Sequence, residues 1–280
     1  MYKFIFIVFL TCFINIGSQA QGKIDSSGIS LQKLAVAIQE DTIISNRFKA
    51  DSIFTRNLVQ VLKTPFSFNF RFDSLIAIKQ IVSPDKAFKI FSWQLDLGDG
   101  TYRQRAALQF PSSDGALRLL PLFDNSDFIV TPTKGVNNRK NWIGAIYYDI
   151  IPTAYKNQTY YTLLGYDEFN LTVSRKIIEV IHFEHDEPIF GGDFFNYPPD
   201  ETYPSAPVDR FLFTYKKGSN AYIRYDSETK HLILSELTST DKDLKATSTL
   251  VPSGNEVYFE WKNGKWVMPA SKASKNNKAH

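Results

Sequence analysis

The chain has 280 residues, with 32 Lys and Arg against 29 Asp and Glu, so its formal net charge is +3. This near balance argues against nucleic acid as a partner, because nucleic-acid-binding proteins present a strongly basic face. The single cysteine, Cys12, lies in a predicted leader. The mature chain is therefore expected to lack disulfides, thiol catalysis and cysteine-bound zinc, and its length is sufficient for a core without them.

Residues 1–20 have the pattern of a secretory signal peptide. Lys3 supplies the positive start, Phe4–Ile14 form an apolar run, and Ala20 precedes the expected cleavage site. The run is shorter than the roughly 20 residues that span a bilayer, and no later segment replaces it. We therefore expect an exported chain with no transmembrane segment, in the periplasm, at the cell surface or secreted. The FLTC sequence ending at Cys12 loosely resembles a lipobox, so lipidation is the alternative.

Residues 21–65 form a predicted helical N-terminal segment. Their apolar residues recur three and four positions apart in two runs: Leu31, Leu34 and Ile38, then Phe54, Leu58, Val61 and Leu62. Pro65 ends the second run. We expect these helices to pack on a β-rich domain over residues 66–270, followed by a disordered tail at 271–280.

Phenylalanines alternate with polar residues from Phe66 to Phe72, in the sequence FSFNFRF. Successive side chains of a strand point to opposite faces, so this pattern predicts a strand with one phenylalanine face. That face is expected to point into the core; the alternative is an exposed ladder for a partner.

Asp99-Gly100 follows an apolar run and precedes another, which predicts a hairpin with a two-residue type I′ turn. In that register Leu97 lies opposite Tyr102, and Asp96 forms a cross-strand salt bridge with Arg103. Asn263-Gly264 predicts a second hairpin near the C-terminus, in which Trp261 lies opposite Trp266 and Lys262 opposite Lys265.

Further runs of β-branched and aromatic residues predict strands in the middle and last third of the chain. Short strands are expected around Leu117 and Phe128, and residues 238 to 256 are expected to be irregular. The main predicted strands are Trp142–Ile151, Thr159–Tyr166, Lys176–Phe183, Pro188–Phe190, Arg210–Tyr215, Ala221–Asp226 and His231–Leu237.

The stretch Ser83–Trp93, SPDKAFKIFSW, resembles the strand opening of TolB-type β-propeller blades, with Lys86 where glycine is usual. The strand rhythm and the W-x-x-G-K-W ending also resemble uncharacterised exported bacterial β-rich proteins, a resemblance that implies no activity. The predicted fold is mainly β, an antiparallel hairpin meander, propeller-like or sandwich, with an N-terminal helical segment; a closed β-barrel is the alternative.

The densest group of metal-ligand residue types is His182, Glu184 and His185, with Asp193 or His231 as outside members. Because polar residues between two apolar runs usually form a turn, an ordinary hairpin tip is the competing interpretation. Likewise, the oxygen-rich residues Asp124 to Asp127 fit a calcium loop or an ordinary solvated turn.

Five tyrosines are the candidate ligand-binding residues, with packing in the core as the alternative: Tyr147, Tyr148, Tyr160, Tyr161 and Tyr166. Four carboxylates could serve a hydrolase, because such pairs are spatial rather than sequential: Asp149, Asp167, Glu168 and Glu179.

No motif of a known catalytic class occurs, and no cofactor is expected. The sequence thus favours a non-enzymatic exported protein that binds a ligand, with a glycan or a cell-envelope protein as partner, or acts as a structural accessory. The alternative is an exported hydrolase, either metal-assisted or carboxylate-based.

Overall fold

The computed structural model describes residues 27–199, 202–241 and 246–269. The predicted signal peptide, Cys12 and the predicted tail lie outside the described residues. Within them, no helix combines the length and the apolar composition needed to cross a membrane.

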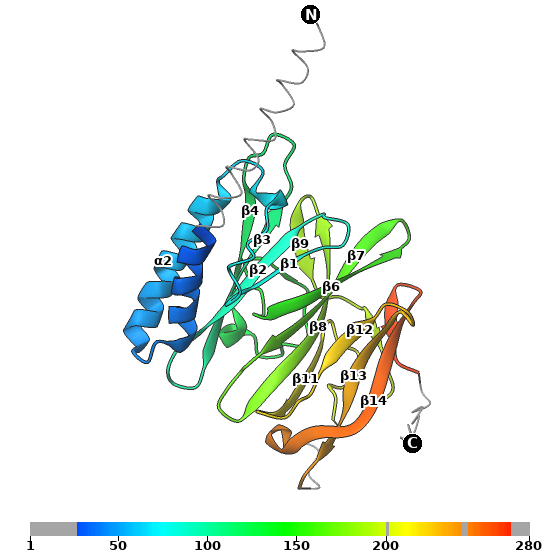
Figure 1. Ribbon diagram of the computed structural model, residues 1–280. Coiled ribbons are helices and arrows are strands. Elements are labelled where there is room, and N and C mark those ends of the chain that lie inside the picture. The colour runs from blue at the N-terminus through cyan, green and yellow to red at the C-terminus, as the bar shows by residue number, and fades with distance from the viewer. Residues whose placement is uncertain (1–26, 200–201, 242–245, 270–280) are drawn as a thin grey trace, which may run out of the picture.

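Four layers are stacked side by side, helices first and then three sheets (Figure 1). The helical layer contains residues 27–40 and α2 (Ile44–Leu62). The first sheet has the order β1 (Lys79–Val82), β2 (Lys89–Asp96), β3 (Tyr102–Phe110) and β4 (Arg118–Phe123).

The central sheet has the order β5 (Asn137–Asn138), β9 (Glu187–Phe190), β8 (Val173–Glu184), β7 (Gln158–Asp167) and β6 (Ile146–Tyr155), and β11 (Phe211–Lys216) also pairs with β8. The third sheet has the order β10 (Phe195–Asn196), β15 (Lys265–Val267), β14 (Leu250–Lys262), β13 (His231–Ser239) and β12 (Ile223–Asp226). Every strand pair is antiparallel except β10 with β15.

Alternating side chains of the central sheet supply two of the three cores. On β8, Ile177 and Ile181 pack toward the first sheet, whereas Ile178 and Val180 pack toward the third. The third core joins the other face of the first sheet to the helices. This alternation follows from strand geometry, in which successive side chains point to opposite faces of the sheet. The mainly β, antiparallel prediction with an N-terminal helical segment is confirmed, and no closed barrel is found among the described residues.

Helix α2 is held to the first sheet by an apolar stripe and one buried carboxylate. Ala50, Phe54, Leu58 and Leu62 recur every four residues and are buried. Asp51 accepts a hydrogen bond from Trp93 Nε1 at 2.8 Å and forms an ion pair with Arg105 at 2.9 Å. The predicted helical segment therefore packs through the apolar spacing on which the prediction was based.

The predicted strand at Phe66–Phe72 is wrong. Phe66 has a φ of +59° and is followed by a 3₁₀ turn (Ser67–Asn69), with irregular backbone beyond it. Ser67, expected on a solvent face, is buried, and its hydroxyl donates to the Leu62 carbonyl at 2.6 Å. The hydrogen bond that ends α2 therefore fixes the backbone here, and the alternation of phenylalanine with polar residues does not produce a strand.

The prediction of a two-residue turn at Asp99-Gly100 is also wrong. The pairing places Asp96 opposite Tyr102 and leaves Leu97–Thr101 as the loop. Asp96 and Asp99 each accept a backbone N–H two residues ahead, from Gly98 and Thr101. Two such Asx turns lengthen the loop and shift the register by one residue.

The predicted Asp96–Arg103 salt bridge is absent as a result of this shift. Asp96 pairs instead with Arg47 of α2 at 2.9 Å, and Arg103 pairs with Asp127 at 3.2 Å. These two ion pairs therefore connect the hairpin to α2 and to the 126–128 turn, and neither of them joins its own strands.

The hairpin at Asn263-Gly264 is confirmed. Both residues have positive φ, and Trp261 lies opposite Trp266 with ring centroids 5.3 Å apart. Such an edge-to-face pair contributes about 0.5–1.5 kcal/mol beyond area burial. The central and late strands also lie where predicted, within a few residues.

Two expectations between and beyond these strands fail. Around Phe128 the chain forms a 3₁₀ turn (Ser126–Phe128) rather than a strand. Residues 238 to 256 are less irregular than expected, because β13 runs to Ser239, a 3₁₀ turn covers Thr247–Thr249, and β14 starts at Leu250.

Candidate functional site

The end of the β7–β8 hairpin places two opposite charges side by side. Asp167 is the last residue of β7 and pairs across the ladder with Arg175 of β8. In the loop between them Phe169 has a φ of +51°, and its N–H donates to Asp167 Oδ1 at 3.0 Å. This Asx turn folds the loop back over the strand ends.

Arg175 lies against the ring of Phe169, with Cζ 3.0 Å from the ring centroid. No hydrogen bond or ion pair joins its guanidinium to any described residue. Burial lowers the pKa of Arg175 to about 10, although the nearby Asp167 charge opposes this shift. Arg175 is half-buried, and none of its nitrogens is both buried and without a partner among the described residues, so its N–H donors face solvent beside the aromatic ring.

Asp167 is held by one of its two oxygens. Oδ1 accepts from Phe169 N and from Gln104 Nε2, the latter at 2.9 Å, whereas Oδ2 accepts no hydrogen bond from a described residue. Burial raises the pKa of Asp167, with the Asp124 charge adding to the effect and the Arg175 charge opposing it. Gln104 itself is buried, and its Oε1 has no partner among the described residues.

These side chains border a cavity of about 290 Å³ between the first and central sheets. Ligand pockets commonly have about 300–1,000 Å³, so the cavity suits a small molecule. Its lining combines the charged pair with the polar residues Thr101, Tyr102, Ser126 and Asp127 and with an apolar wall of Ile129, Ile143, Ile177 and Leu212. We refer to it as the Arg175 pocket.

Two other cavities, of about 390 and 450 Å³, lie along β1. The larger is bordered by Lys89, whose pKa burial lowers to about 8. Lys89 Nζ, however, donates to the carbonyls of Phe68 and Phe70 at 2.9 and 3.0 Å and lies over three phenylalanine rings. Because its charge is already engaged, this cavity is a weaker site candidate than the Arg175 pocket.

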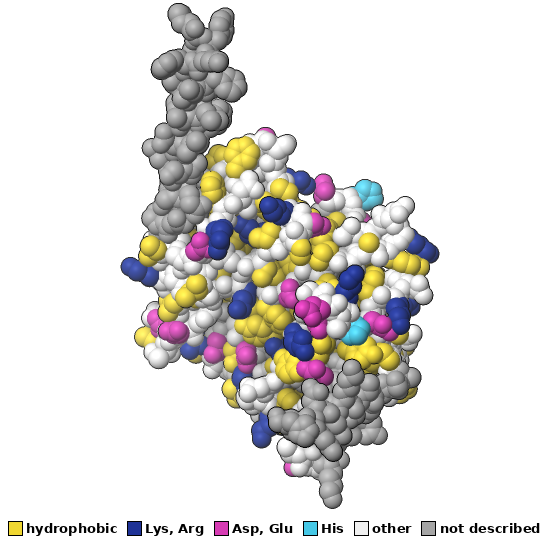
Figure 2. All heavy atoms as spheres, turned by 45° about the vertical axis from the view of Figure 1, so that its right-hand side comes forward, with side chains coloured by type: hydrophobic (Ala, Val, Ile, Leu, Met, Phe, Trp, Pro, Cys, Tyr) yellow, Lys and Arg dark blue, Asp and Glu magenta, His cyan; other side chains and the backbone are white. Residues whose placement is uncertain are grey.

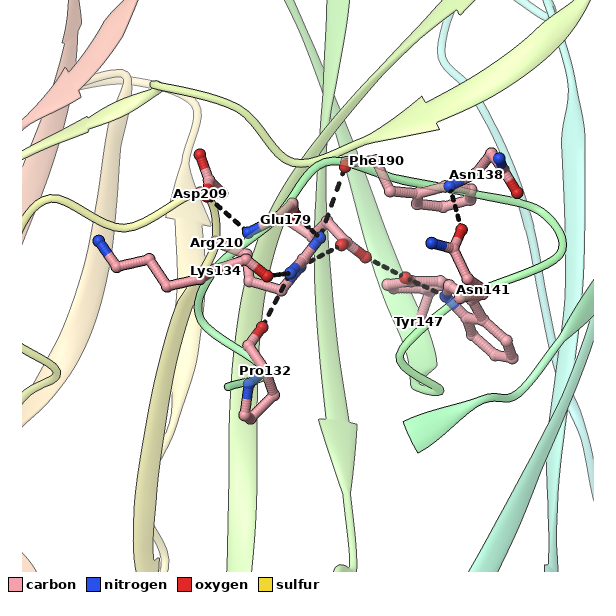
Figure 3. A network of polar contacts seen from close by, with 11 residues as sticks. Pro132, Lys134, Asn138, Asn141, Tyr147, Glu179, Phe190, Asp209 and Arg210 are labelled. Carbon is pink, nitrogen blue, oxygen red and sulfur yellow. Dashed lines mark hydrogen bonds and ion pairs between the residues drawn. The ribbon is translucent and has the colours of Figure 1, made fainter. Parts of the chain in front are cut away.

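A second arginine, Arg210, is the centre of a fully buried network (Figure 3). Its Nε donates to Glu179 Oε1 at 2.7 Å, and Glu179 Oε2 accepts from Tyr147, whose hydroxyl accepts from Trp142 Nε1. The remaining four N–H groups have backbone acceptors on Pro132, Lys134, Gly135 and Phe190. With every donor matched, Arg210 binds the loop before β5 to the central sheet and has a structural role.

The structure does not gather the five candidate tyrosines on one face. Tyr147 and Tyr161 are buried between the first and central sheets, whereas Tyr148 and Tyr160 pack toward the third sheet. The Tyr148 and Tyr166 rings lie 6.4 Å apart, each near the Lys176 ammonium. Ligand binding by these tyrosines remains a prediction.

The proposed metal ligands lie at the β8–β9 hairpin. His182 Nε2 is 3.1 Å from Glu184 Oε1, while His185 and Asp186 form the turn itself with positive φ values. Of the outside members, Asp193 pairs with Lys265, and His231 stacks on Tyr258. In the part of the chain that the structure describes, no group of three or more His, Cys, Asp or Glu could hold a metal ion.

Three of the four hydrolase carboxylates lie apart from the Arg175 pocket. Glu179 belongs to the Arg210 network, and Glu168 pairs with Lys217 at 3.2 Å. Asp149 is half-buried, and burial raises its pKa. Asp167 alone among the four borders the cavity.

The oxygen-rich turn from Asp124 to Asp127 lies beside the pocket. Asp124 Oδ1 accepts from Ser126 N and Oγ at 3.0 and 2.7 Å, and its Oδ2 accepts from Gln104 N at 2.7 Å. Its carboxylate therefore orders the turn and fixes the backbone of Gln104 beside the cavity.

Sequence reasoning singled out Asp167 but missed Arg175, Phe169 and Gln104. Asp167 and Arg175 flank the connection between two predicted strands, Thr159–Tyr166 and Lys176–Phe183, so their cross-strand pairing could have been found from that hairpin. Gln104 lies 63 positions from its partner Asp167, and no local pattern indicates that contact.

The chain matches no protein-family model, no curated protein and no solved structure.

Proposed function

We propose that this chain is an exported, non-enzymatic binding protein of the periplasm or cell surface that holds a small anionic group in the Arg175 pocket. The supporting observation is the guanidinium of Arg175, which is half-buried and stacked on Phe169 but has no protein acceptor among the described residues. Guanidinium groups bind carboxylates and phosphates through paired, charge-assisted hydrogen bonds.

The charges that line the Arg175 pocket, and the mixed charges over one face of the molecule, favour a small ligand over a polyanion. Cationic and anionic side chains are mixed over the face drawn in Figure 2. The Arg175 cavity is small, and the carboxylates of Asp127 and Asp167 border it. An extended polyanion needs a continuous basic surface, whereas a small ligand needs one well-placed cation.

The second candidate is a carboxylate hydrolase with Asp167 as general acid, because burial raises the pKa of that group. Asp127, the other carboxylate that lines the cavity, pairs with Arg103, and both oxygens of the adjacent Asp124 already accept hydrogen bonds within the protein. A nucleophile or general base needs a free oxygen facing the substrate, so the geometry supports binding better than catalysis.

Calorimetric titration of the purified protein tests this proposal. The probes are acetate, benzoate, inorganic phosphate and the twenty common L-amino acids. We expect at least one to bind, and Arg175→Gln to weaken that binding about tenfold or more, as the loss of a charge-assisted hydrogen bond predicts. Arg224→Gln, which removes an exposed ion-pairing arginine on the third sheet, is the matched control. Failure of every probe, or equal binding by Arg175→Gln, would contradict the proposal.

Export has its own test. Mass spectrometry of the protein recovered from cells should show an N-terminus at Gln21, the residue after the predicted cleavage site. An intact N-terminus at Met1, or a lipid-modified one at Cys12, would contradict the expected processing.

A further inference from the structure

We infer that the ligand of the Arg175 pocket is a zwitterion, an α-amino acid, whose carboxylate binds Arg175 and whose ammonium binds Asp167. This inference rests on the proposed binding function and specifies its ligand class.

The first argument is the charge of the pocket. Asp167 and Arg175 are cross-strand neighbours that influence each other electrostatically, yet they form no ion pair. A bare anion at Arg175 would meet repulsion from the Asp167 carboxylate, and a bare cation at Asp167 would meet repulsion from Arg175. A ligand carrying both charges satisfies both groups and leaves the net charge of the pocket unchanged.

The hydrogen-bonding groups of Arg175 and Asp167 that have no protein partner among the described residues also fit an α-amino acid. Arg175 offers guanidinium donors, and Asp167 offers Oδ2, since Oδ1 is occupied by Gln104 and Phe169. A carboxylate accepts hydrogen bonds and an ammonium donates three, so the two ends of an amino acid correspond to the two open positions. Gln104 and the Phe169 N–H fix the orientation of the Asp167 carboxylate in advance, which lowers the entropic cost of binding.

The remaining wall indicates what kind of side chain the amino acid carries. Ile143, Ile177 and Leu212 supply apolar surface, and Ile177 and Leu212 belong to the packed core between the first and central sheets. Burying an apolar side chain against this wall is favourable. Asp127, the one further charged residue of the described lining, already pairs with Arg103, so a charged ligand side chain would lose hydration without a free partner. The cavity volume of about 290 Å³ restricts the ligand to a single residue.

The experiment compares three forms of one compound on the wild-type protein. Calorimetry first identifies the tightest of the twenty L-amino acids; its N-acetyl form, which lacks the ammonium, and its decarboxylated amine are then titrated. We expect each analogue to bind about tenfold more weakly or worse, as loss of one charge-assisted contact implies. In Asp167→Asn the difference between the amino acid and its N-acetyl form should largely disappear, because this substitution keeps the shape of the side chain but removes its charge.

The outcomes separate this inference from the proposed function. Equal or tighter binding of the N-acetyl form, or binding of acetate, benzoate or phosphate with no amino acid bound, overturns the zwitterion and leaves anion binding standing. Failure of every probe overturns both. Because the analogue series uses wild-type protein, the result does not depend on whether Asp167→Asn folds.

Discussion

Arg210 and Arg175 lie close to the same pair of strands, β11 and β8, but their surroundings differ. Arg210 is fully buried with a carboxylate and four carbonyls around it, whereas Arg175 is half-buried with a phenylalanine ring and no acceptor among the described residues. Burying a charge is costly unless its hydrogen bonds are met. The comparison assigns Arg210 to the stability of the fold, and Arg175 is the arginine that we propose binds a ligand.

Replacement of Arg210 should have the largest effect on stability. Arg210→Met leaves the Glu179 side chain buried and without its partner, and removes the donors to the 132–135 loop. Breaking one side of a buried pair costs about 3–5 kcal/mol. Urea unfolding of the variant should show a loss of this size in the free energy of unfolding.

Arg224→Met is the control, because its ion pair with Glu256 is exposed and should contribute about 1 kcal/mol or less. A loss below about 1 kcal/mol for Arg210→Met would mean that the buried network does not stabilise the fold as its geometry implies.

Tyr147→Phe should have the next largest effect. It removes the hydroxyl that accepts from Trp142 Nε1 and donates to Glu179 Oε2, leaving two buried polar groups with one partner fewer. An unsatisfied buried group costs about 1–3 kcal/mol, and chemical denaturation should show a loss in that range. An unchanged midpoint would indicate that water enters the network.

The two hairpins show which parts of the fold could be predicted from sequence. The Asn263-Gly264 turn could be predicted from two adjacent residues, because both adopt the positive φ that a two-residue turn requires. At Asp99-Gly100 two Asx turns changed the register, and at Phe66 the end of α2 prevented a strand. Predictions from local sequence patterns were therefore confirmed where the backbone conformation of the turn residues determined the structure. They were wrong where a polar side chain formed a competing hydrogen bond with the backbone.

The candidate site was predictable only in part for a related reason. Asp167 was identified by its residue type, but its significance comes from Gln104 and from the loop that brings Phe169 over Arg175. The contact with Gln104 joins the first sheet to the central sheet, and sheet packing was not determined by strand prediction. A sequence indicates which strands exist more readily than which sheet faces meet.

Arg175→Gln should affect stability far less than Arg210→Met. It removes a stacking contact worth about 0.5–1 kcal/mol but also removes a poorly compensated charge, so the free energy of unfolding should change by less than about 1 kcal/mol. Thermal and urea unfolding without ligand measure this directly. A loss of about 3 kcal/mol would place Arg175 with Arg210 as a structural residue.

Asp167→Asn should give the smallest effect, visible as a pH dependence. Burial raises the pKa of Asp167 above its usual 3.8, so the folded state holds the proton in a range where the unfolded state has lost it. The contribution of Asp167 to stability is therefore full below about pH 3.8 and is lost as the pH rises through the raised pKa. The stability of Asp167→Asn relative to wild type should rise over that range in unfolding experiments; a constant or falling difference would contradict the direction of the shift.

The most direct test of the contrast is a side-chain NMR titration. Arginine Nε–H resonances of the ¹⁵N-labelled protein are assigned by their loss in Arg175→Gln and Arg210→Met, and the tightest-binding amino acid is then added. The account predicts that the Arg175 resonance moves in proportion to saturation while the Arg210 resonance remains in place. An Arg175 resonance that stays fixed while the ligand binds elsewhere would contradict it.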